Sequence, residues 1–181
     1  MKKSARGFIA FVALLGILAL VNGSIWSKEQ HLANGRVVYL QLAPVDPRSL
    51  MQGDYMQLRF AVADQIYRAL PKANNQRRWV QDVEATDGLV AVTLDDNRVA
   101  TYLSLYEPNE REQESTKPPD ELLLRYRVRN GAVKFATNAF FFQEGHEPVY
   151  RSAQYGEFRV DEAGELLLTA LYDSELNRLG P

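Results

Sequence analysis

Cysteine is absent from the 181 residues of the chain, which excludes disulfides, thiolate nucleophiles and Cys-ligated zinc. Histidine is scarce: His31 and His146 are too few for a multi-histidine metal centre. Neither sign of charge is in large excess, since 21 basic side chains stand against 23 acidic ones, so a nucleic-acid partner is not expected. A glycine-rich phosphate loop and a calcium-loop motif are also missing. We therefore expect neither a metal nor a cofactor.

Long apolar runs are missing too, apart from one near the N-terminus. Residues 8–21 carry no polar side chain and follow basic residues at positions 2, 3 and 6. From Phe8 to Trp26 the chain has nineteen residues, or about 28 Å of helix, which matches a hydrocarbon core of roughly 30 Å. The sequence predicts a single transmembrane helix here. Its N-terminus is expected in the cytoplasm, because the basic cluster precedes the apolar run.

A cleavable signal peptide is the alternative for this segment, with small residues before Ser24 as the cleavage site. We favour a retained anchor because residues 25–34 continue the helical pattern and Gly35 stands where a helix ends. Such a helix would bury the cleavage site. The predicted organisation is therefore a cytoplasmic tip, anchor and stalk over residues 1–35 and an exported domain over residues 36–181.

In the exported part, apolar and polar residues mostly alternate, which is typical of strands that bury one face. Short turns such as Asn130-Gly131 indicate hairpins. Residues 61–70 and 147–155 instead have a helical pattern, the second ending before Gly156. We predict a mainly β (α+β) fold, an antiparallel β-rich domain with two short helices. The predicted strands cover residues 37–42, 55–60, 88–94, 98–106, 121–129, 132–142, 157–160 and 165–172.

The loop from Pro44 to Asp54 is the first candidate for a functional site. Its two prolines cannot lie in a central strand, so it forms a turn or rigid loop. Its polar groups either form a recognition surface or cap turns through their own backbone, with glycine supplying a positive φ. The candidate binding residues are Asp46, Arg48, Gly53, Asp54 and Tyr55.

Aromatic residues suggest where the core lies. On residues 55–60, we expect Tyr55, Leu58 and Phe60 to be buried. Three consecutive phenylalanines at 140–142 cannot all face one core, because neighbouring side chains on a strand point to opposite faces. Phe141 is therefore expected under the 147–155 helix, or otherwise exposed as a contact patch.

Residues 53–60 read GDYMQLRF and follow PVDPRSLMQ, a combination that resembles the signature of the GDYxxLxY family. The resemblance includes Lys28-Glu29, Gln143-Glu144-Gly145 and residues 155–159 (YGEFR). Phe60 stands where the family has a tyrosine, so this position has no phenolic hydroxyl and a packing role is expected. The resemblance implies a membrane-anchored bacterial protein of uncharacterised function that works beside polytopic membrane proteins, and it implies no catalytic residues.

Together these observations predict a single-pass protein of the bacterial inner membrane, with its N-terminus in the cytoplasm and its C-terminal domain in the periplasm. The domain is expected to be a non-catalytic binding or assembly module, an accessory partner of a polytopic membrane protein contacted through the stalk and the 44–54 loop. The alternative is a cell-envelope hydrolase that uses a carboxylate or Ser49 of that loop.

Overall fold

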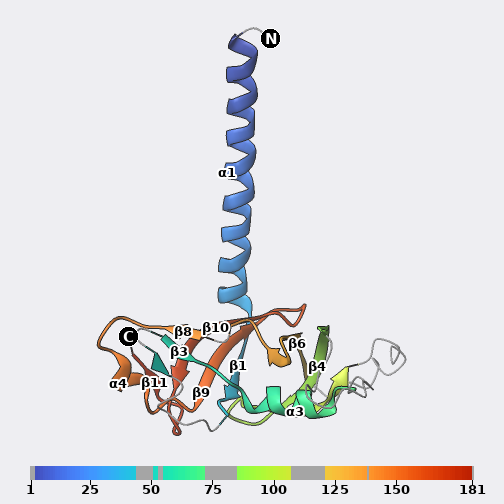
Figure 1. Ribbon diagram of the computed structural model, residues 1–181, viewed down its shortest axis with the longest axis vertical. Helices are drawn as coiled ribbons and strands as arrows, with labels where there is room; N and C mark the ends of the chain where they lie inside the picture. The colour runs from blue at the N-terminus through green and yellow to red at the C-terminus, as the bar shows by residue number, and fades with distance from the viewer. Residues whose placement is uncertain are drawn as a thin grey trace. The chain divides into compact units, whose positions relative to one another are not determined.

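The computed structural model describes residues 3–43, 51–52, 55–71, 85–106, 121–137 and 139–180. The chain divides into two compact units, Met1–Gly35 and Arg36–Pro181. The fold is β-rich, with antiparallel sheets and an N-terminal apolar helix, as the sequence predicts (Figure 1).

The first unit is the helix α1 (Lys3–Asn34), drawn in blue in Figure 1. It runs without a break through the predicted stalk, and the Gly35 N–H donates to the His31 carbonyl at 2.9 Å. In the described part of the chain, α1 contains the one helix segment, Phe11–Asn34, long and apolar enough to cross a membrane. Large apolar side chains such as Phe11 and Leu20 lie exposed along it. In length and composition, α1 matches a membrane anchor or a signal sequence.

Three sheets appear in the described part of the second unit, and the strand pairs within them are antiparallel. The first has the order β1 (Arg36–Gln41), β9 (Tyr155–Val160), β10 (Leu166–Tyr172) and β11 (Arg178–Leu179). The second has the order β2 (Met51–Gln52), β3 (Tyr55–Gln57) and β8 (Ala139–Phe141). The third has the order β5 (Ala100–Tyr106), β4 (Asp87–Leu94), β6 (Glu121–Arg129) and β7 (Ala132–Lys134).

The two short helices are α3 (Ala61–Ala69) and α4 (Glu147–Tyr150). The helix α3 packs against β1, β5 and β7, and it buries Val62 and Ile66. The sheets and α3 share one apolar core, because alternate residues of each strand point inward. Each fully buried side chain of this size stabilises the fold by roughly 1.5–3 kcal/mol. The largest buried side chains are Phe135, Phe158, Leu40, Leu58, Ile66, Leu124 and Leu171.

Turn residues fix the hairpins and join two of the sheets. Asn130 and Gly131 have φ values of 53° and 69°, the positive values of the tight turn that the sequence predicts. In the β9–β10 turn, the Asp161 carboxylate accepts the N–H groups of Ala163 and Glu165 at 3.0 and 2.9 Å. The carbonyl of Gly164 in this turn then accepts the N–H of Arg125 in β6, at 2.8 Å.

Two predicted strands are shorter than expected. The 132–142 strand is divided: β7 pairs with β6, whereas β8 pairs with β3 in another sheet. The chain leaves the sheet of β5, β4, β6 and β7 where Phe135 turns into the core, and it bends where Thr137 Oγ1 bonds the backbone of Ala139. The 55–60 strand pairs as β3 only over its first three residues, and Phe60 then forms an isolated bridge with Leu42.

The predicted 147–155 helix is also shorter, because α4 ends at Tyr150. Gly156 does not end a helix but lies buried within β9. A Cβ atom there would lie 3.2 Å from Leu168 Cδ1 and 3.3 Å from both Phe60 Cε1 and Phe158 Cε2. Close packing of these three side chains therefore explains the glycine.

Candidate functional site

Four of the five candidate binding residues from the sequence, Asp46, Arg48, Gly53 and Asp54, lie outside the described residues, as does Ser49. Tyr55 is described, and it opens β3 directly after the Gly-Asp pair. We call residues 53–60 (GDYMQLRF) the octet. The candidate site is therefore described from Tyr55 and from the side chains around residues 57–60, the second half of the octet.

An aromatic pair with one exposed ring lies on the sheet that contains β3. Tyr55 and Phe141 stand directly opposite each other on β3 and β8, with ring centroids 5.7 Å apart. Phe141 is 74% exposed, whereas Tyr55 is half-buried. The prediction that Tyr55 lies in the core is therefore wrong, because it faces away from the buried Met56.

The expected cover of Phe141 by the second short helix is also wrong. Tyr150 of α4 packs instead on Phe140 and Phe142, with centroids 5.1 and 5.2 Å from its own ring. These two phenylalanines flank Phe141 in the chain, so Phe141 points to the opposite face. Phe141 is thus exposed, which agrees with the second interpretation of the sequence.

A pocket of about 530 Å³ adjoins the second half of the octet. Residues 57–60 form one wall, Ala63, Asp64 and Tyr67 of α3 a second, and residues 129–134 of the β6–β7 hairpin a third. Apolar side chains of Leu58, Phe60 and Val133 contribute to its lining and belong to the buried core.

Cations outnumber acids in this lining. The described lining has Arg59, Arg129 and Lys134 against the single carboxylate of Asp64. Arg59 Nη2 lies 2.9 Å from Asp64 Oδ1, and Arg129 Nη2 lies 2.7 Å from the Asp87 carboxylate outside the lining. The pocket therefore has a positive charge excess.

Phe60 ends the octet in the position where a tyrosine was expected. Its ring is 3% exposed and packs edge-on against Phe158 and Phe135, with centroids 5.3 and 6.0 Å away. The prediction that Phe60 is a core residue is confirmed. The position contributes packing, and the residue is also part of the pocket lining.

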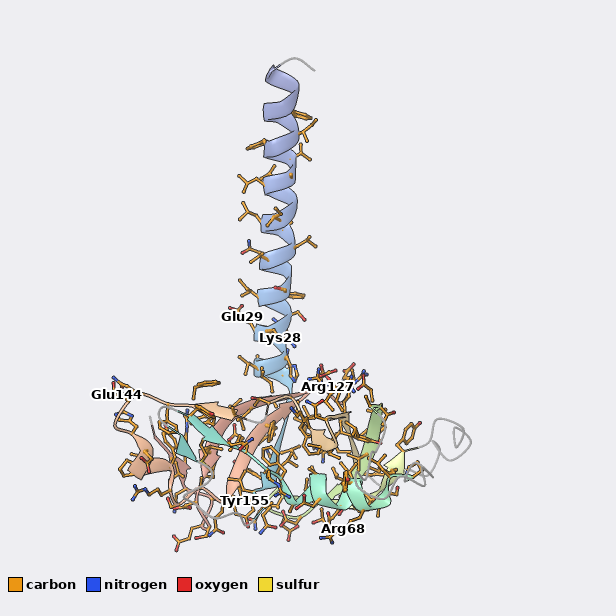
Figure 2. The ribbon with its side chains drawn as sticks, in the orientation of Figure 1. Lys28, Glu29, Arg68, Arg127, Glu144 and Tyr155 are labelled. Atoms are coloured by element: carbon orange, nitrogen blue, oxygen red, sulfur yellow. The ribbon has the colours of Figure 1, made fainter. Side chains whose placement is uncertain are left out.

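A second polar cluster lies on β1, β9 and β10, centred on the partly buried carboxylate of Glu157. Thr169 donates to Oε1 at 2.6 Å, while Tyr172 and Tyr39 donate to Oε2 at 2.5 and 3.3 Å. Tyr39 on β1 is the direct cross-strand partner of Glu157 on β9. Tyr155, labelled in Figure 2, is the first residue of β9. We call Glu157 and its three hydroxyl partners the Glu157 network.

Burial alone would raise the pKa of Glu157, but the hydroxyl hydrogen bonds from Thr169 and Tyr172 outweigh it, aided by the charge of Arg159. The pKa of this carboxyl is therefore lowered. Burial, together with the hydrogen bond to Glu157, raises the pKa of Tyr172, which stays protonated. An ionised carboxylate surrounded by hydroxyl donors is a weak proton acceptor, so its main effect is to hold three strands together.

Sequence reasoning missed the Glu157 network, because its members are spread over three strands. The signal was present in residues 155–159, which place a carboxylate between buried neighbours, but periodicity does not reveal which hydroxyls oppose it. For metal binding, the described residues contain no group of three His, Cys, Asp or Glu side chains close enough to hold an ion.

Comparison with known proteins gives one result. The model of one protein family, described as "GDYXXLXY protein", matches residues 17–171. No curated protein and no solved structure matches the chain.

Proposed function

The chain belongs to the GDYXXLXY family, and we propose that it is a single-pass inner-membrane protein whose periplasmic domain binds a polytopic membrane protein as an accessory subunit. The N-terminus lies in the cytoplasm, because the basic residues precede the apolar segment. The domain is a non-catalytic binding or assembly module.

The Tyr55–Phe141 pair, in which Phe141 is exposed and Tyr55 is half-buried, is the observation that supports this function best. A phenylalanine that is 74% exposed loses hydrophobic free energy unless another surface covers it. Aromatic side chains at the centre of a protein interface contribute a large share of its binding energy. Tyr55 also directly follows the 44–54 loop in the chain. The proposed contact surface is therefore this aromatic pair together with that loop.

Two features favour a membrane-protein partner. One residue, Gly35, separates α1 from β1, so an anchored α1 keeps the domain close to the bilayer. The chain beyond residue 6 has 18 basic against 23 acidic residues, so an anionic lipid surface does not attract it by charge. Both features favour a membrane protein over the lipid surface as the partner of this domain.

Site-specific photo-cross-linking in native membranes tests the proposal. A benzophenone amino acid replaces Phe141 of the full-length chain, and the control replaces Leu103, an apolar residue of β5 that is 50% exposed. We expect position 141 to form an adduct with one polytopic protein, and Tyr55→Ala to reduce it strongly. Adducts with lipid alone, or equal adducts at both positions, would contradict the proposal.

The hydrolase alternative is tested separately with Asp54→Asn. If the 44–54 loop is a scaffold, this variant retains the adduct at position 141 and changes no hydrolytic activity. If Asp54 is a catalytic carboxylate, the variant abolishes turnover while the adduct persists. Turnover by wild type that the variant lacks would therefore overturn the non-catalytic proposal.

A further inference from the structure

From the pocket beside the octet, we infer a binding site for a small organic anion, one with a carboxylate or phosphate group on an apolar body. This site is separate from the Tyr55–Phe141 contact and does not depend on the partner proposed above. The size of the pocket, its lining and its charge all favour such a ligand.

The size and lining of the pocket suit a small molecule. Its volume of about 530 Å³ falls within the range of roughly 300–1,000 Å³ that is usual for ligand pockets. Ala63 and the half-buried aromatic side chain of Tyr67 offer apolar contact, while Leu58, Phe60 and Val133 of the lining are at most 9% exposed. Small-molecule sites typically combine such an apolar lining with a few fixed polar groups.

The charge of the pocket opposes that of the protein. The chain carries a formal net charge of −2, yet the described lining has three cations and one carboxylate. Ion pairs hold two of these cations: Arg59 with Asp64, and Arg129 with Asp87. Arg129 also donates to the carbonyls of Val128 and Thr86, at 2.8 and 3.2 Å. These contacts place Arg129 firmly at one side of the pocket.

Lys134 is the third cation and the most direct candidate for the ligand's charged group. It lies on β7, half-buried, opposite Arg127 in the sheet register. In the part of the chain that the structure describes, no acidic group lies within ion-pair distance of Lys134. The ammonium group of Lys134 would gain a charge-assisted hydrogen bond from an anionic ligand in the pocket.

Phenyl phosphate is a suitable probe because it joins an anion to a small apolar body, and benzyl alcohol is a neutral molecule of similar shape. Titration calorimetry uses the full-length chain in neutral detergent micelles at low salt. We expect saturable binding of phenyl phosphate, weakening as salt rises, and at least tenfold weaker binding of benzyl alcohol. Equal affinity for the two probes would overturn the inference.

Variants of the lining should change the affinity in opposite directions. Lys134→Glu should weaken phenyl phosphate binding about tenfold or more, while Lys134→Arg should keep most of it. Asp64→Asn should strengthen binding severalfold, since it removes the carboxylate of the described lining. Arg178→Ala, a change on the exposed strand β11 outside the lining, is the control and should have no effect.

Further outcomes decide the identity of the anion. If inorganic phosphate competes with phenyl phosphate, the site recognises the phosphate group. If benzoate binds more tightly than phenyl phosphate, the site recognises a carboxylate. If an acidic peptide binds and phenyl phosphate does not, the pocket serves a protein segment and the inference fails. Unchanged binding in Lys134→Glu, with the fold shown intact by circular dichroism, would also overturn it.

Discussion

Replacing Glu157 with alanine removes the acceptor that three hydroxyl groups share, so we expect a clear loss of stability. Thr169 and Tyr172 donate at 2.6 and 2.5 Å, and Tyr39 at 3.3 Å. A hydrogen bond to a charged group contributes ~1.5–3 kcal/mol. Because Glu157 is only partly buried, water can replace part of each lost hydrogen bond. The free energy of unfolding should therefore fall by about 2–3 kcal/mol.

Differential scanning calorimetry of the full chain in detergent measures this loss. At roughly 2–4 °C per kcal/mol for a domain of this size, Glu157→Ala should lower the Tm by about 5–10 °C. Glu157→Gln keeps the shape and one acceptor but loses the charge, so its Tm should fall by only about 3 °C. Glu165→Gln is the matched control: it breaks an exposed ion pair with Arg125 and should change the Tm by less than about 2 °C.

The contribution of Glu157 should also depend on pH. Its folded pKa is lowered from the ordinary value of 4.5, so the unfolded chain binds the proton more readily. The stabilisation is therefore fully present above about pH 4.5 and is lost as the pH falls through the folded pKa. We expect the Tm difference between wild type and Glu157→Gln to shrink in acid. A Glu157→Ala variant within about 2 °C of wild type at pH 7, or a difference that persists in acid, would refute the account of the Glu157 network.

Three further outcomes are expected. Gly164→Ala should destabilise the chain by roughly 1–3 kcal/mol in chemical denaturation, because its φ is +77° and a Cβ atom would lie 2.8 Å from the Leu123 carbonyl oxygen. The control Gly131→Ala has a φ of +69° but open space around the Cβ atom, so it should destabilise the chain less. An equal loss in the two variants would contradict this explanation. Phe158→Ala should cost about 3–5 kcal/mol, since its ring is fully buried, and a loss below 1 kcal/mol would contradict its place in the core. Mass spectrometry of the protein from its own membrane should find residues 1–23 retained, whereas a chain beginning at Ser24 would identify a signal peptide.

Alternation along the chain was enough to predict most of the fold of residues 36–181. On β6, Leu124, Tyr126 and Val128 are buried, Leu122 is partly buried and Arg125 is exposed, because a period of two directly determines which face a side chain occupies. The Asn130-Gly131 turn was equally predictable, since few residues adopt positive φ without strain.

The errors arise where long-range packing decides the structure. The pattern of residues 132–142 is continuous, yet the strand changes sheets once Phe135 enters the core. Gly156 is typical of a helix end in the sequence, but its neighbours in space are the rings of Phe60 and Phe158. Local pattern does not encode either neighbour, because they come from distant segments.

The candidate site was predicted in part. The octet was identified from its motif, but its second half forms a pocket only because α3 and the β6–β7 hairpin lie beside it. Exposure of Phe141 depends on which phenylalanines Tyr150 covers, and a run of three identical residues does not show this. Four of the candidate binding residues lie outside the described residues: Asp46, Arg48, Gly53 and Asp54.

The most direct test of the central claim is quantitative co-purification of the tagged full-length chain after cross-linking in its own membranes. The account predicts that one polytopic membrane protein is recovered reproducibly, that Phe141→Ser removes most of it, and that Leu103→Ser, an equally apolar surface change on β5, does not. Recovery of no membrane protein, or recovery that Phe141→Ser leaves unchanged at equal expression, would contradict the claim that this domain binds such a partner through its exposed aromatic pair.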